Sequence, residues 1–286
     1  MACNRFFHSS ALTACCFLFL GCASFMSNSA DNFTKAVMKQ ADPKLVRDGA
    51  PAYLLLMVGL IEGNPKSAKL LLAGAQLYGA YNSAFVAVRE PERALILSAK
   101  AKDYAIRALS MRNKDFAQVH DKPFSRFAEC LPTFTKKDVP ALFLVISAWA
   151  AWIQARSDNW DAVADVAKIQ GMNERLLQLD ETYYYGSPHI VMGVLCTLLP
   201  PGLGGRPQEA KKHFEKAIEI GKGRFLQAYV LYAKQYARMM NDRELYDRLL
   251  KTALSTPADV EPELTLINTL AKEDAAKLLA EADGFF

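Results

Sequence analysis

The strongest constraint on the fold is a small–aromatic–small stripe in the second half of the chain. Ala210, Phe214 and Ala217 stand at i, i+4 and i+7, so they share one face of an α-helix. Upstream, Gly193 lies in the apolar segment 190–195. A glycine opposite two alanines lets antiparallel helices approach closely, and the phenylalanine ring fills the groove toward the next pair. This spacing predicts a helical hairpin whose connection runs through residues 199–207.

A second hairpin of similar composition is expected directly afterwards. Its first helix carries Ala233 and Tyr236. Its second begins at an N-cap pair, Asn241 with Glu244, and Pro257 follows its end. Two adjoining hairpins with these features are typical of tetratricopeptide (TPR) repeats.

Weaker versions of the same pattern occupy the first half of the chain. Gly59 precedes a stripe of Ala68, Leu72 and Ala75, and a stripe of alanines lies at positions 101, 105 and 108. No segment alternates with a period of two over a useful length, which argues against strands. We therefore predict an all-α fold of about four TPR-like hairpins, the N-terminal ones degenerate. A C-terminal helical segment at 261–283 is expected to cap the last repeat.

Three dipeptides predict helix starts, because each pairs an N-cap residue with proline at the first helical position. They are Asp42–Pro43, Asn64–Pro65 and Ser187–Pro188.

Composition limits the classes of function. Hydrophobic residues make up 51% of the 286 residues, and the mean hydropathy is +0.02, so apolar surface is expected in a cavity or partner face. The longest apolar run, residues 139–153, contains Pro140 and Ser147 and is too short to span a membrane. The net charge of +4 is small and scattered, which argues against nucleic-acid binding.

The N-terminal segment has the features of an export signal. Arg5 precedes an apolar run and then Gly21-Cys22-Ala23, which resembles a bacterial lipobox. We predict a lipoprotein signal peptide at 1–21, acylation of Cys22, a tether at 22–32 and a single all-α TPR-like domain at 33–286. The alternative is an ordinary signal peptide that contains a cysteine. Cys130 and Cys196 are expected to be buried free thiols, with a disulfide between them as the alternative.

Motifs for catalysis, cofactors or metals are missing, including HExxH, GxSxG, CxxC and a phosphate-binding loop, which predicts a protein that is not an enzyme. His213 lies beside two lysines and is expected to be solvated, whereas His189 is expected to open a helix. Aromatic rings can line an apolar ligand site. We take as candidate ligand- or pore-lining residues the set Trp149, Trp152, Tyr183, Tyr184, Tyr185 and His189. Core packing is the alternative role for each of them.

With these residues identified, the sequence resembles the TatT family, the TPR-containing lipoprotein component associated with bacterial TRAP transporters. The resemblance is carried mainly by residues 185–189, 199–205, 210–217, 223–226, 241–244, 257–264 and 268–272. It implies a periplasmic, lipid-anchored protein without catalytic activity, which partners the solute-binding (P) component of a TRAP system. It also implies a homotrimer with a pore and a small hydrophobic ligand.

The residues and the resemblance together predict passage of a small hydrophobic or amphipathic solute through an apolar pore. The alternative is a TPR lipoprotein scaffold for outer-membrane protein assembly, which would bind protein segments and need no internal cavity.

Overall fold

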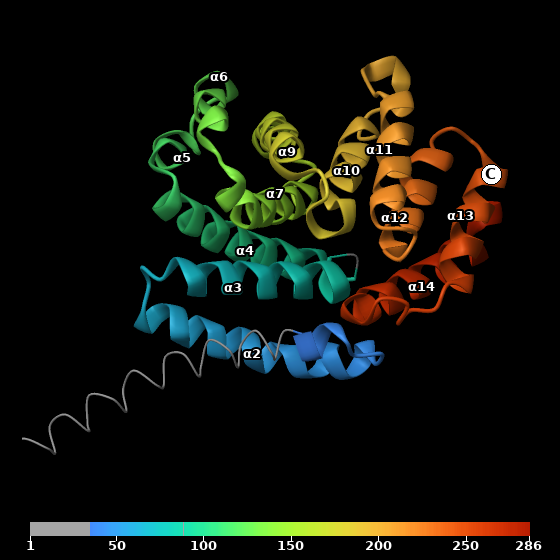
Figure 1. Cartoon of the computed structure of the whole chain (residues 1–286), viewed down its shortest axis with the longest axis horizontal. Coiled ribbons are helices and arrows are strands. Elements are labelled where there is room, and N and C mark those ends of the chain that lie inside the picture. The colour runs from blue at the N-terminus through green and yellow to red at the C-terminus, as the bar shows by residue number, and fades with distance from the viewer. Residues whose placement is uncertain (1–34, 88) are drawn as a thin grey trace, which may run out of the picture.

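The computed structural model describes residues 35–87 and 89–286, and within these ranges it contains helices and no strand (Figure 1). The all-α prediction is confirmed for this part of the chain. The predicted signal peptide, Cys22 and the tether lie outside the described residues. From residue 43 onward the α-helices are α2 (Pro43–Gly63), α3 (Ala68–Tyr81), α4 (Pro91–Arg112), α5 (Lys114–Val119), α6 (Phe124–Phe127), α7 (Val139–Gln154), α8 (Trp160–Ala164), α9 (Val166–Asp180), α10 (Tyr183–Cys196), α11 (Pro207–Ile220), α12 (Leu226–Leu231), α13 (Arg243–Ser255) and α14 (Thr265–Ala280).

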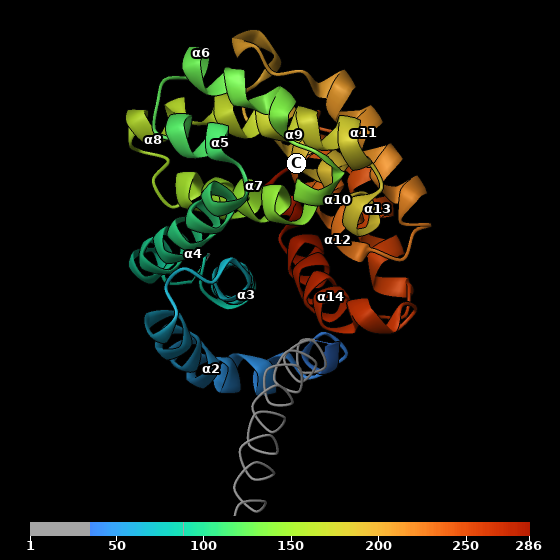
Figure 2. The same ribbon diagram turned by 60° about the vertical axis from the view of Figure 1, so that its left-hand side comes forward.

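Helices that follow one another along the chain also lie beside one another in space. Helix α4 lies between α3 and α7, α10 pairs with α11, and α14 covers α12 and α13. The row of helices curves round so that α14, near the end of the chain, contacts α2, near the start of the described residues (Figure 2). The fold is therefore a curved helical array, with α2 at its outer edge (Figure 1).

Some helix starts agree with the predicted caps and others do not. Asp42 caps α2, since its carboxylate accepts a hydrogen bond from Leu45 N at 3.1 Å. The predicted start at Asn64–Pro65 is wrong, because α3 begins three residues later with Ser67 as its cap. The cap of α13 is Asp242 rather than Asn241. Asn241 has a positive φ of 54°, which places it in the turn before the helix instead of at the extended N-cap position.

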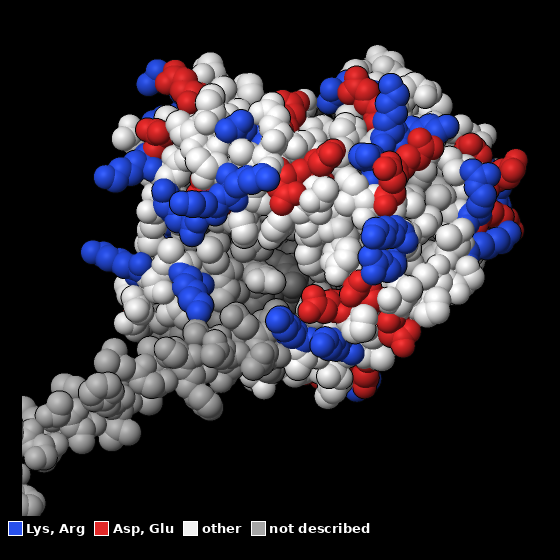
Figure 3. Space-filling view, in the orientation of Figure 1, with Lys and Arg blue, Asp and Glu red and all other residues white. Residues whose placement is uncertain are grey.

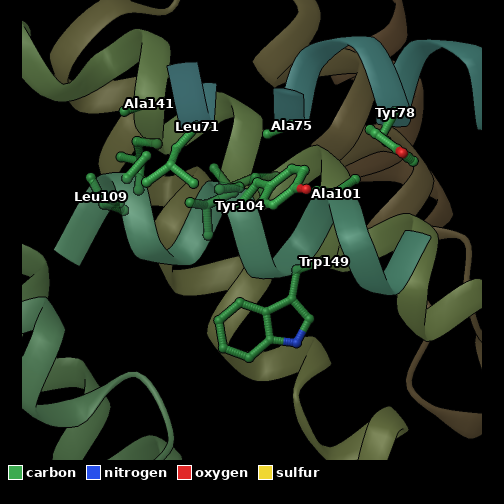
Figure 4. Packing of buried hydrophobic residues seen from close by; sticks show 14 of the residues in the cluster. Leu71, Ala75, Tyr78, Ala101, Tyr104, Leu109, Ala141 and Trp149 are labelled. Atoms are coloured by element: carbon green, nitrogen blue, oxygen red, sulfur yellow. The ribbon is translucent and has the colours of Figure 1, made fainter. Parts of the chain in front are cut away.

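The array contains two hydrophobic clusters. The first draws on α2 to α9 and the second on α10 to α14. Helix α4 is central to the first, because Ala101, Ala105 and Ala108 are fully buried and let its neighbours approach. Figure 4 shows Leu71 and Tyr104 on the α3 side of α4, with Trp149 of α7 on the other side. Buried Cys130 and Cys196 are free thiols.

The first hairpin uses a different glycine from the predicted one. Gly59 is exposed, and a Cβ built on it would meet no atom within 4 Å. A Cβ on Gly74 would instead lie 2.7 Å from Ile61 Cδ1 and 2.9 Å from Tyr104 Cδ2. The contact stripe of α3 therefore passes through buried Leu71, Gly74 and Ala75. Ala75 belongs to the predicted stripe, whereas the predicted Ala68 and Leu72 are only half-buried.

None of the helices in the described part of the chain combines the length and the apolarity that a membrane crossing requires.

Candidate functional site

Helices α10 and α11 make a close contact at Gly193. A Cβ on this residue would lie 2.8 Å from Phe214 Cζ, so only glycine leaves room for the ring. Ala210, Phe214 and Ala217 are each fully buried. The Phe214 ring stacks on Tyr232, with centroids 5.2 Å apart and planes 15° apart. The α10–α11 hairpin also packs against the residues at the very start of α10.

That segment is a left-handed break at the start of α10, which we call the tyrosine turn (residues 183–186). The φ angles are 41° at Tyr184, 58° at Tyr185 and 80° at Gly186. A left-handed conformation costs a non-glycine residue about 1–2 kcal/mol. Gly186 lies against α11, where an added Cβ would come 3.2 Å from Ala217 Cα. Strain of this kind is kept only where surrounding contacts fix it.

Ser187 has a different role from the predicted N-cap. Its Oγ donates a hydrogen bond to Tyr184 O at 2.6 Å, instead of accepting one from the following backbone. The Gly186 N–H donates to Thr182 O at 3.3 Å. These two bonds close the tyrosine turn on itself, and the regular part of α10 follows.

The turn sends its three tyrosine rings to different places. Tyr183 packs against Phe143 of α7 at 5.3 Å, on the side of the first cluster. Tyr185 packs against Phe225 at 6.1 Å, on the side of the second. Tyr184 lies between them, with Phe143 at 6.4 Å and Phe225 at 5.8 Å, and keeps 37% of its surface exposed. The tyrosine turn therefore joins the two clusters, and Tyr184 is the most exposed of its three tyrosines.

The phenol groups remain neutral. Burial raises the pKa of Tyr184 to about 12, and nearby Tyr185 contributes to the same shift. Burial also raises the pKa values of Tyr183 and Tyr185. A protonated phenol can donate and accept a hydrogen bond, so Tyr184 combines an apolar ring with a polar tip.

His189 contacts two side chains, His213 and Glu181, where α9, α10 and α11 meet. Its Nδ1 lies 2.9 Å from Nδ1 of His213, and its Nε2 lies 3.1 Å from Glu181 Oε2. One neutral arrangement satisfies both contacts: His189 Nε2–H donates to Glu181 while Nδ1 accepts from His213 Nδ1–H. His213 is half-buried, so the expectation that it is solvated is wrong. Burial and then the neighbouring His189 lower the pKa of His213.

The two tryptophans of α7 form a second aromatic site, which includes a lysine that sequence reasoning missed. Trp149 is buried and donates from Nε1 to Asp165 Oδ2 at 3.1 Å. Trp152 is half-buried, and Lys102 Nζ lies 3.4 Å from its ring centroid and 4.6 Å from that of Trp149. Lys168 Nζ lies 2.9 Å from Asp165 Oδ1. Burial lowers the pKa of Lys102 to about 8.

The structure does not bring all the predicted ligand residues into one site. Phe143, which contacts the tyrosine turn, and Trp152 are nine positions apart on α7, which corresponds to about 13 Å along the helix. Trp149 and Trp152 therefore belong to one aromatic site, and Tyr183, Tyr184 and Tyr185 to another.

A hollow of about 820 Å³ lies elsewhere, along one face of α13, and is lined mainly by charged side chains such as Arg243, Asp247, Arg248 and Lys251. It contains none of the aromatic candidates and is open to solvent. The face drawn in Figure 3 carries basic and acidic side chains interspersed, without a broad patch of one sign. Among the described residues, no three His, Cys, Asp or Glu side chains group as metal ligands would.

The family model described as TRAP transporter T-component matches residues 39–286, which include every helix described above. No curated protein matches the chain.

Proposed function

The chain belongs to the TRAP transporter T-component family, and on that basis we propose that it partners the solute-binding (P) component of a TRAP system and passes a small hydrophobic or amphipathic solute. Membership of the family makes the protein a transport-associated component. The partner and the solute are the proposed steps beyond it.

The tyrosine turn is the observation that carries the proposal. Left-handed backbone at two successive tyrosines is strained, and such strain concentrates at ligand sites and switch regions. The strained segment displays the ring of Tyr184 between Phe143 and Phe225. An apolar ring with a neutral hydroxyl suits a solute that has an apolar body and one polar group. Half-buried Trp152 beside Lys102 supplies a second surface of the same kind.

We also propose that the protein is held in the periplasm by acyl chains on Cys22 and works as a homotrimer with a pore. The lipobox-like Gly21-Cys22-Ala23 supports the anchor, and the trimer rests on family resemblance alone. Replacing Cys22 by alanine should abolish acyl labelling and release the protein from membranes. Retention of both label and membrane association by this variant would refute the assignment.

Tyr184→Asn is a suitable probe of solute handling. Asparagine tolerates the left-handed backbone better than tyrosine, so the fold should survive while the ring of Tyr184 is lost. We expect weaker binding of the amphipathic fluorophore 1-anilinonaphthalene-8-sulfonate, measured by titration, and unchanged binding of the solute-binding protein. The matched control is Trp160→Asn, because Trp160 is 86% exposed on α8 and belongs to neither aromatic site.

Cross-linking in cells followed by identification of partners tests the docking half of the proposal. Recovery of a periplasmic solute-binding protein supports it. Recovery of β-barrel assembly proteins without a solute-binding protein would replace it by the scaffold alternative. Equal fluorophore binding by wild type and Tyr184→Asn would remove the tyrosine turn as the solute site.

A further inference from the structure

Helix α2 has an apolar face on the side away from the core. Its inner side buries Leu54 and Ile61. A stripe at positions 45, 49, 52, 56, 59 and 63 lies on the opposite side, because these spacings of three and four share one helical face. The stripe consists of leucine, alanine and glycine, and all six residues are exposed. Leu45 and Leu56 expose 60% and 57% of their surface, and Leu55 at its border exposes 73%.

This face, which we call the α2 outer face, is unusual for the edge of a helical array. End repeats normally carry a polar outer surface, because no further repeat covers them. Single exposed leucines are common, but a contiguous apolar stripe marks a surface that contacts something else. A Cβ on Gly49, Gly59 or Gly63 would meet no atom within 4 Å, so no other segment among residues 35–87 and 89–286 covers these positions.

The position of α2 along the chain indicates what covers it. Of the helices whose bounds are given above, it lies nearest to Cys22 in sequence, and 20 residues separate Cys22 from Pro43 at its start. Even a fully extended chain reaches only about 3.5 Å per residue, so acylation at Cys22 would hold the start of α2 within about 75 Å of the bilayer.

Charge favours lipid over a second copy of the chain. Residues 35–69 contain six basic side chains (Lys35, Lys39, Lys44, Arg47, Lys66 and Lys69) against three acidic ones (Asp42, Asp48 and Glu62), a net charge of +3. The basic residues lie toward both ends of α2 and the apolar stripe lies between them. Anionic phospholipid attracts such a segment, whereas two copies of it would repel each other.

We propose that the α2 outer face rests on an anionic bilayer surface, with Leu45, Leu55 and Leu56 in the interfacial layer. The inference rests on the proposed acylation of Cys22, which brings α2 to the membrane. The array would then stand with its α2 edge on the bilayer and with α6 on the far side (Figure 1). The far side would be free to dock a periplasmic protein.

The test uses the full acylated chain in vesicles of phosphatidylethanolamine and phosphatidylglycerol. An environment-sensitive nitrobenzoxadiazole label is placed at Leu55→Cys, and quenching by spin-labelled phospholipid reports contact with lipid. The matched control is Ile96→Cys, because Ile96 is 66% exposed but lies on α4. The native thiols at Cys130 and Cys196 are buried, and a labelled wild-type sample corrects for their background.

We expect quenching at position 55 to exceed that at position 96 severalfold, and to fall when phosphatidylcholine replaces phosphatidylglycerol. Equal quenching at the two positions on vesicle-bound protein would overturn the proposal. A second result would also overturn it: the label at position 55 shows no quenching by lipid, and it becomes shielded from water as the protein concentration rises in detergent. That result would mean that the α2 outer face binds a second copy of the chain. Failure of the wild-type protein to float with vesicles or to carry acyl chains would instead refute the anchor, before position 55 is measured.

Discussion

Gly193→Ala measures how closely α10 and α11 approach. The added Cβ would lie 2.8 Å from Phe214 Cζ and 2.9 Å from both Cε atoms, well inside normal contact distance. Phe214 is fully buried and stacks on Tyr232, so its ring has little freedom to move away. Overpacking of this kind costs about 1–3 kcal/mol. Alanine gains about 1 kcal/mol over glycine inside a helix, so the net loss should be about 0–2 kcal/mol.

Gly59→Ala is the matched control, because it makes the same substitution inside α2 where an added Cβ meets no atom within 4 Å. It should stabilise the protein by about 0.5–1 kcal/mol. The difference between the two variants therefore isolates the steric cost at Gly193, about 1–3 kcal/mol. Urea unfolding of both variants measures it, provided that the m-value stays unchanged. In a protein of this size each kcal/mol also shifts the melting temperature by about 2–4 °C.

Two outcomes decide whether the reasoning holds. Equal stabilisation by Gly193→Ala and Gly59→Ala would show that Phe214 does not press on Gly193, and the packing described here would be wrong. If the contact is real, Phe214→Leu should be less damaging in the Gly193→Ala background than in wild type, because the smaller side chain leaves room for the new methyl group. A double-mutant cycle over these two positions gives this coupling directly.

Three further predictions concern polar groups that are buried or half-buried. Folding lowers the pKa of Lys102 to about 8 from an ordinary 10.5. Between these pH values the unfolded chain binds more protons than the folded one, so the free energy of unfolding should rise with pH across that window. Urea unfolding at pH 7.5 and 9.5 should show this rise in wild type and not in Lys102→Met. The pKa of His213 is lowered in the folded protein. As the pH falls through the ordinary value of 6.5, His213 is therefore protonated in the unfolded chain before it is protonated in the folded one. The free energy of unfolding should drop toward pH 5.5 in wild type, and less in His213→Gln. Asn268 is fully buried; its Oδ1 accepts a hydrogen bond from Leu226 N, and its Nδ2 donates to the carbonyl oxygens of Arg224 and Ala258. Asn268→Ala should therefore lower the free energy of unfolding by about 2–4 kcal/mol, measured in urea. An unchanged urea midpoint would contradict these hydrogen bonds.

Local periodicity was enough to predict the all-α fold and the buried face of α11. Ala210, Phe214 and Ala217 are spaced along one helix, so their common burial follows from sequence alone. The same stripe could also have predicted the partial burial of His213, because His213 stands three positions after Ala210 and four before Ala217. Its neighbouring lysines pointed to solvent, but position on the helix decides burial.

Contacts between distant segments carried no such signal. Lys102 of α4 and Trp152 of α7 are 50 positions apart, and nothing in the spacing of either helix indicates that one covers the other. The first hairpin shows a related difficulty. Gly59 and Gly74 are equally small, and only the approach of Ile61 and Tyr104 to Gly74 distinguishes the glycine at the contact from the exposed one.

The tyrosine turn could not be predicted, because local preferences oppose it. Ser187–Pro188 reads as a helix start, and tyrosine rarely adopts a positive φ. The structure nevertheless holds Tyr184 and Tyr185 there. A regular helix through residues 183–186 would rotate each ring by about 100° from the last, whereas the observed turn lets Tyr183 reach Phe143 and Tyr185 reach Phe225. Packing on both hydrophobic clusters thus stabilises this backbone, and a solute that displaced the ring of Tyr184 would act on the junction between them.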